Sequence, residues 1–128
     1  DHQFKDEEGK DISHCECCFF PTLNSEGSFV AFVEIKDCKA KSVSQYRNKA
    51  KEQILSTVQM FKSSDIIIDK QRIYGILSFP RRKKMLFNDF PYRDIFEETR
   101  WVKDYGIHLL ASNEVIIESD ARIHVPNL

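Results

Sequence analysis

The sequence lacks the patterns that mark several large classes of protein. Its 128 residues include only four Gly and four Pro, and no internal repeat, low-complexity tract or clear linker is visible. No apolar run approaches the ~20 residues that a helix needs to cross a bilayer. The N-terminus reads DHQFKDEEGKD and has no apolar stretch of a secretory signal. We therefore expect a cytoplasmic protein with no membrane contact.

The residues that are present indicate a packed core. Hydrophobic residues make up 41% of the chain and aromatic residues 12%, mostly as ten Phe. Such a chain is too apolar and too aromatic to be disordered. We expect one domain over 1–128, in which the polar residues 1–12 form a loop or a frayed terminus. The first residue is Asp and not Met, which suggests a piece of a longer chain.

Charge is balanced overall but uneven along the chain. Lys and Arg number 19 against 20 Asp and Glu, a net charge of −1, so the total indicates no class of partner. Residues 36–51 carry six basic residues and one acidic residue, and 70–84 carry six basic residues and no acidic one. Two such segments could hold a polyanion in one groove. The alternative is ordinary solvated surface of helices and loops.

The cysteines predict buried thiols more than a metal site. They are Cys15, Cys17, Cys18 and Cys38. Without a secretory signal we expect them to be reduced. Cys15 and Cys17 lie two apart, which is the period of a strand and not the spacing of paired zinc ligands. In a strand, Cys15 and Cys17 would share one face, with Glu16 and Cys18 on the other.

The hydrophobic pattern predicts an α/β protein. Strands are expected over 14–20, 29–36 and 72–79, and the unbroken apolar run of the second predicts that both of its faces are covered. The strongest helix covers 42–61, with an inward stripe at three- and four-residue steps. That stripe is Val43, Tyr46, Ala50, Ile54, Val58 and Phe61.

The C-terminal third predicts a second helix followed by a hairpin. The helix covers 90–105 and turns Ile95, Trp101 and Val102 inward. Residues 107–111 and 114–118 are expected to pair through a turn at Ser112-Asn113. The order β-β-α-β-α-β-β predicts a mixed α/β sandwich with one dominant helix.

Glu34 and Lys36 are the most informative charged residues. They stand two apart at the end of the most apolar strand, so both point to the same face. An acid and a base in partly buried space need each other or a metal, because burying one unpaired charge is costly. A structural ion pair is the simpler interpretation.

Pairing of the first two strands can bring a second carboxylate to Glu34. An antiparallel register that sets Cys18 opposite Phe32 and Phe20 opposite Val30 also sets Glu16 opposite Glu34. The Cβ atoms of such a pair lie about 4.5–5.5 Å apart, and like charges there repel. A divalent cation between them would remove the repulsion, and Mg²⁺ prefers oxygen ligands of this kind.

These residues resemble the motifs of the PD-(D/E)xK nuclease superfamily. The matching segments are Cys15-Glu16-Cys17, Val33-Glu34-Ile35-Lys36 and Glu52-Gln53-Ile54. The resemblance covers about 11–79 and implies a restriction-endonuclease-like mixed sheet with one dominant helix and a flanking second helix. The sequence departs from the family in having Glu16 where Asp is usual, no Pro-Asp pair and no first helix. Asp11 is the alternative first acid.

The resemblance also implies roles for individual residues. Glu16, Glu34 and the carbonyl of Ile35 would hold Mg²⁺ or Mn²⁺. Lys36 would orient the attacking water and stabilise charge on the phosphate, and Gln53 would lie beside the site. The expected activity is metal-dependent hydrolysis of phosphodiester bonds in nucleic acid, with DNA as the favoured substrate.

The basic segments would supply phosphate contacts that do not depend on sequence. The residues concerned are Lys39, Lys41, Arg47, Arg81, Arg82 and Lys83. One alternative is an inactive nuclease fold used for binding, such as a component of a defence or toxin–immunity system. Another is a module that binds nucleic acid without cleaving it. Association with a second copy or with a partner protein stays open.

Overall fold

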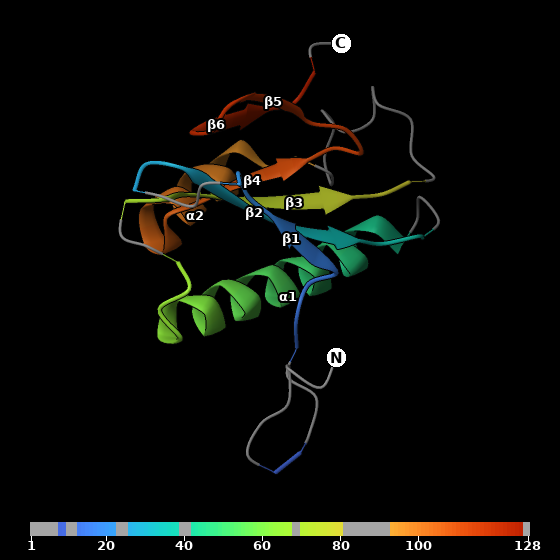
Figure 1. Cartoon of the computed structure of the whole chain (residues 1–128). Coiled ribbons are helices and arrows are strands. Elements are labelled where there is room, and N and C mark those ends of the chain that lie inside the picture. The colour runs from blue at the N-terminus through green and yellow to red at the C-terminus, as the bar shows by residue number, and fades with distance from the viewer. Residues whose placement is uncertain are drawn as a thin grey trace.

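The computed structural model describes residues 8–9, 13–22, 26–38, 42–67, 70–80 and 93–126. The elements follow in the order β1 (Cys17–Phe19), β2 (Phe29–Ile35), α1 (Val43–Ser63), β3 (Arg72–Ser78), α2 (Ile95–Tyr105), β4 (Ile107–Ala111), β5 (Ile116–Ser119) and β6 (Arg122–His124). The predicted order of the first six elements is confirmed (Figure 1).

The first four strands form one mixed sheet in the order β1-β2-β3-β4. β2, β3 and β4 are parallel, and β1 runs antiparallel to β2. The pairs Cys17 with Val33 and Cys18 with Phe32 match the predicted register over β1 itself. The ladder begins at Cys17, and Glu16 is an exposed residue before it, so the predicted pairing of Glu16 with Glu34 is not part of the sheet. The chain is therefore a mixed α/β protein, and the ends of β2, β3 and β4 lie along one edge of the sheet.

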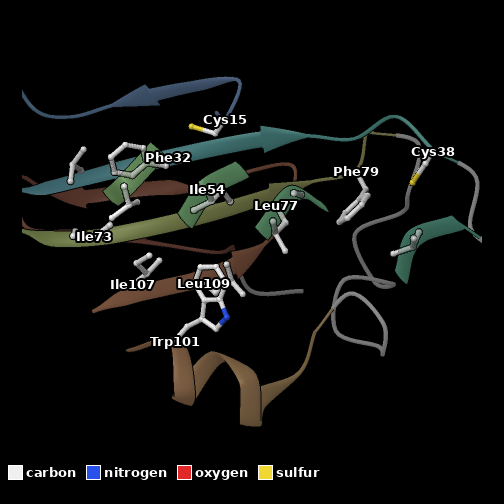
Figure 2. Packing of buried hydrophobic residues seen from close by; sticks show 14 residues of the cluster. Cys15, Phe32, Cys38, Ile54, Ile73, Leu77, Phe79, Trp101, Ile107 and Leu109 are labelled. Atoms are coloured by element: carbon white, nitrogen blue, oxygen red, sulfur yellow. The ribbon is translucent and has the colours of Figure 1, made fainter. Parts of the chain in front are cut away.

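Both helices pack on one face of this sheet. The main core cluster joins Phe32 of β2, Ile54 of α1, Leu77 of β3 and Leu109 of β4 with Trp101 of α2 (Figure 2).

Gly75 in β3 allows α1 to approach the sheet closely. A Cβ at this position would lie 3.0 Å from a methyl carbon of Ile54 and 3.3 Å from side-chain atoms of Ile107 and Leu109. Side chains of neighbouring residues therefore occupy the space that a side chain at position 75 would need. The close contact between α1 and the sheet depends on glycine at this position.

A separate two-stranded sheet of β5 and β6 covers the other face (Figure 1). Phe29, Ala31, Tyr74, Ile76 and Ile123 form the second core cluster beneath it. The backbone N–H of Phe29 also donates to the carbonyl of Asp120 over 2.8 Å. This cover confirms the prediction that both faces of the second strand are buried.

The predicted pairing of the C-terminal strands is wrong. β4 joins β3 in parallel, and Ser112 extends that ladder by donating its N–H to the carbonyl of Leu77 over 3.0 Å. β5 instead pairs with β6, where Ile116 lies opposite His124. The α2 crossover explains the difference, because a strand that enters through a helix returns parallel to the strand before that helix. Gly106, with φ of 69°, ends α2 directly before β4.

The helix ends and faces also differ from the predicted ones. In α1, Tyr46 is 38% exposed and Arg47 is buried, so the inward stripe passes through 43, 47, 50, 54, 57 and 58. In α2, Ile95 and Val102 are exposed and Trp101 is the buried residue. Residues 90–92 of the predicted second helix lie outside the described residues. Arg47 is tolerated inside because acidic residues of α2 face it.

Within the described part of the chain, no helix combines the length and the apolar character that crossing a membrane requires.

Candidate active site

Glu34 and Lys36 form an ion pair where β2 leaves the sheet. Glu34 is only 3% exposed, and the Nζ of Lys36 lies 2.8 Å from its Oε2. Lys36 is also fixed through its backbone, because its N–H donates to the carbonyl of Ser78 over 2.9 Å. The two side chains therefore share a face, as their spacing predicts.

The second carboxylate oxygen of Glu34 has no such partner. Its Oε1 is buried, and no described residue donates a hydrogen bond to it. An unsatisfied buried polar atom costs about 1–3 kcal/mol and calls for an explanation. A carboxylate oxygen in this position is an acceptor that a cation can satisfy.

Gln53 of α1 shows the same feature. Its Nε2 donates to the carbonyl of His14 over 3.2 Å, which holds the amide group in place. Its Oε1 is buried and receives no hydrogen bond from any described residue. Gln53 thus contributes a second buried oxygen without a described hydrogen-bond partner. It lies on α1, the helix that covers the face of the sheet to which Glu34 points.

Thr57, one turn after Gln53, fixes the residues before β1. Its Oγ1 accepts from the N–H of Cys15 over 2.8 Å and donates to the carbonyl of Gln53 over 2.8 Å. Together, Gln53 and Thr57 attach residues 14–15 to α1. Thr57 is not among the residues predicted for the site. A hydroxyl within an apolar stripe, four residues after Gln53, is the signal that marks it.

The chain bends at Glu16, and this overturns the predicted alternation of the cysteines. Cys15 is buried with the main core cluster (Figure 2), whereas Cys17 is exposed, so they do not share one face. The bend arises because Thr57 binds the N–H of Cys15 and draws it toward α1. Glu16 is exposed as a result, next to the first residue of β1. Glu34 is therefore an inner carboxylate and Glu16 an outer one.

The pKa values of two cysteine thiols near the site are raised. Partial burial raises the pKa of the Cys17 thiol, and the charges of Glu16 and Glu34 raise it further. Burial also raises the pKa of Cys15 to about 11; the hydrogen bond to Thr57 opposes this rise, and the charge of Glu34 adds a smaller contribution to it. The two thiols stay protonated at neutral pH, which suits buried or weakly reactive cysteines and not nucleophiles.

Arg47 is not on the surface, where a residue that binds phosphate would have to be. It is buried, and its Nη1 donates to Oε1 of Glu97 over 2.5 Å. Lys51 donates to the other oxygen of Glu97 over 2.5 Å. Arg47 therefore joins α1 to α2 and does not present its charge on the surface.

Several other predicted residues lie outside the described part of the chain. They are Asp11, Lys39, Lys41, Arg81, Arg82 and Lys83. Ile35 is described and its side chain is 43% exposed. Its neighbours Glu34 and Lys36 point to the opposite face, as expected for alternate residues of a strand.

The candidate site offers oxygen atoms and not a cluster of charged ligands. Among the described residues, no group of three or more His, Cys, Asp or Glu side chains lies together. The two buried oxygens without partners belong instead to one carboxylate and one amide, Glu34 and Gln53. Carboxylate and amide oxygens suit Mg²⁺ and Mn²⁺, whereas zinc would favour the thiolates that this site does not form.

Comparison with known proteins returned no match: no protein-family model, no curated protein and no solved structure is similar to this chain.

Proposed function

We propose that this protein is a metal-dependent nuclease of the PD-(D/E)xK type that hydrolyses phosphodiester bonds in nucleic acid, with DNA as the favoured substrate. The observation that carries the proposal is the buried Glu34–Lys36 pair, whose Oε1 oxygen has no described partner. Gln53 repeats this feature: its Oε1 is also buried without a described partner, on the helix that covers the face of the sheet to which Glu34 points.

Each residue has a defined task in this proposal. Glu34 and Gln53 would hold the cation through their Oε1 atoms, and Glu16 and the Ile35 carbonyl would be its other protein ligands. Bound Mg²⁺ or Mn²⁺ would polarise the scissile phosphate and lower the pKa of a coordinated water. Lys36 is 17% exposed, so its ammonium can meet a phosphate oxygen or orient the attacking water while Glu34 holds it in position.

The expected substrate rests on the basic residues, and the expected location in the cell rests on the cysteines. Five of the six residues expected to bind phosphates lie outside the described residues, so phosphate binding at those residues stays a prediction. Lys49, in the same basic segment as Arg47, is exposed on α1 and can contribute. The expected cytoplasmic location also stays a prediction; Cys15, Cys17, Cys18 and Cys38 form no disulfide in the described part of the chain.

The first test separates cation binding from cleavage. Calorimetric titration of Mn²⁺ and cleavage of single-stranded and duplex DNA would be measured for the wild type, Glu34→Ala and Lys36→Ala. We expect Glu34→Ala to lose both activities, since it removes a cation ligand. Lys36→Ala should lose cleavage and keep Mn²⁺ binding, because the ammonium does not ligate the cation.

Matched controls come from charged residues away from the site. Glu26→Ala removes an exposed carboxylate that pairs with Lys70, and Lys62→Ala removes an exposed ammonium at the end of α1. Both variants should bind Mn²⁺ and cleave as the wild type does. A Glu34→Ala protein with full cleavage activity would refute the proposed mechanism.

The second candidate is a nuclease fold that binds without cleaving. The observation in its favour is that Glu34 already neutralises Lys36, so the pair can be satisfied without a metal. Such a protein would bind nucleic acid in a salt-dependent way and would be indifferent to Mg²⁺ and to the loss of Glu34. The same titration, repeated with a DNA duplex present, distinguishes the two functions.

A further inference from the structure

The segment just before β1 is attached to α1 by two hydrogen bonds that the proposed chemistry does not itself require. Gln53 holds the carbonyl of His14, and Thr57 holds the N–H of Cys15. We infer that Thr57 is a positioning residue: by holding the N–H of Cys15, its hydroxyl fixes the place of Glu16, the outer cation ligand of the proposed site. This inference rests on the proposed nuclease function.

The position of Glu16 is fixed from both sides. On one side, Cys15 is tied to Thr57 over 2.8 Å. On the other side, Cys17 is the first residue of the β1 ladder and pairs with Val33. With only Glu16 between these two fixed points, its backbone has little freedom. Removing the hydroxyl of Thr57 would release one of these two points and let the Glu16 carboxylate leave its place.

Packing alone does not explain a hydroxyl at this position. Thr57 is 2% exposed and lies in the buried stripe of α1 with Ile54 and Val58, where an aliphatic side chain of similar shape would fit. Within a helix, the bond from a Thr hydroxyl to the carbonyl four residues earlier adds little stability. The remaining contact is the N–H of Cys15, which precedes β1 and receives its acceptor from Thr57.

The test compares variants that keep or remove this hydroxyl. Thr57→Val keeps the shape, Thr57→Ala removes the hydroxyl and relieves any crowding, and Thr57→Ser keeps the hydroxyl but loses the methyl group. Thr99→Val is the matched control, because Thr99 makes the same bond to the carbonyl four residues earlier, Ile95, on the exposed side of α2. Mn²⁺ affinity is measured by calorimetry below the melting temperature of every variant, with the Mn²⁺ dependence of cleavage as the second readout.

We expect Thr57→Val and Thr57→Ala to weaken Mn²⁺ binding by about tenfold or more, the usual effect of losing a group that orients a metal ligand. Thr57→Ser and Thr99→Val should bind as the wild type does. A role in stability alone would lower the melting temperature of Thr57→Val and leave its Mn²⁺ affinity below that temperature unchanged.

The outcomes separate this inference from the function on which it rests. If the wild type binds Mn²⁺ and both hydroxyl-free variants bind it within twofold of the wild type, Thr57 does not position the site and the proposed function stands. If Thr57→Val does not fold, Thr57→Ala and Thr57→Ser decide the question. If the wild type binds no Mn²⁺, with or without DNA, the proposed function fails and this inference fails with it.

Discussion

Glu97 joins the two helices through two cations, and its replacement by Gln tests the stability of the packed face directly. Its carboxylate accepts from Arg47 with one oxygen and from Lys51 with the other. The three side chains are only 8%, 12% and 16% exposed for Arg47, Lys51 and Glu97. Glu97→Gln keeps the shape and removes the charge, so two cations lose the anion that neutralises them.

The expected loss in the free energy of unfolding depends on whether each cation can reach water once Glu97 is replaced. Lys51 has a flexible stem and can turn its ammonium to water, but Arg47 is buried and cannot. Removing one member of a buried ion pair costs about 3–5 kcal/mol. Glu98 lies within electrostatic range of Arg47 and moderates the loss, so we expect about 3 kcal/mol. That is a large part of the 5–15 kcal/mol or so by which domains are stable.

Urea unfolding measures this difference. The midpoint for Glu97→Gln should fall while the slope with urea concentration stays the same. Glu118→Gln is the control, since Glu118 faces His124 over 3.5 Å in a mostly exposed pair, and its loss should cost less than about 1 kcal/mol. Replacing Arg47, Lys51 and Glu97 together by Met should restore most of the stability, because no buried charge remains. A loss below about 1 kcal/mol in Glu97→Gln would contradict this account of the helix contact.

Two further predictions concern the same packed face. Burial alone would raise the pKa of Glu97, but hydrogen bonds from Lys51 and Arg47 hold it below its usual value. Its contribution is therefore complete above the unfolded pKa of about 4.3 and lost as the pH falls through the lower folded value. The stability difference between wild type and Glu97→Gln, measured by urea unfolding from pH 7 to pH 3, should shrink only at the acid end, and a constant difference would argue against the shift. Gly75→Ala should cost about 1–3 kcal/mol, because the new methyl group would lie 3.0 Å from Ile54; unchanged thermal unfolding would show that α1 moves aside freely.

The sequence predicts the centre of this fold well, because local patterns decide it. The alternation of side chains in a strand is enough to place Glu34 and Lys36 on one face. The apolar matches between the first two strands are enough to set Cys18 opposite Phe32. The position of Arg47 could not be predicted in this way, because its burial depends on Glu97, fifty positions further along the chain.

The errors arise where distant contacts override local patterns. The bend at Glu16 depends on a hydrogen bond from Cys15 to Thr57, so strand alternation alone assigns the wrong face to Cys15. The C-terminal strands resemble a hairpin locally, but the α2 crossover commits β4 to a parallel place beside β3. For the candidate site, the sequence identifies the ion pair and Gln53, whereas the inner and outer positions of the two carboxylates require the three-dimensional structure.

The parallel pairing of β2 with β3 also constrains how the molecule can fold. Phe29 lies opposite Arg72, so the ladder joins segments that are separated by the whole of α1. Bringing such distant segments together costs loop-closure entropy before any apolar surface is buried, and this slows folding. The residues of the candidate site come from three segments: the approach to β1, the end of β2 and the middle of α1. They come together only when α1 packs on the sheet, so a partly folded chain without this packing contains their sequence but not their arrangement.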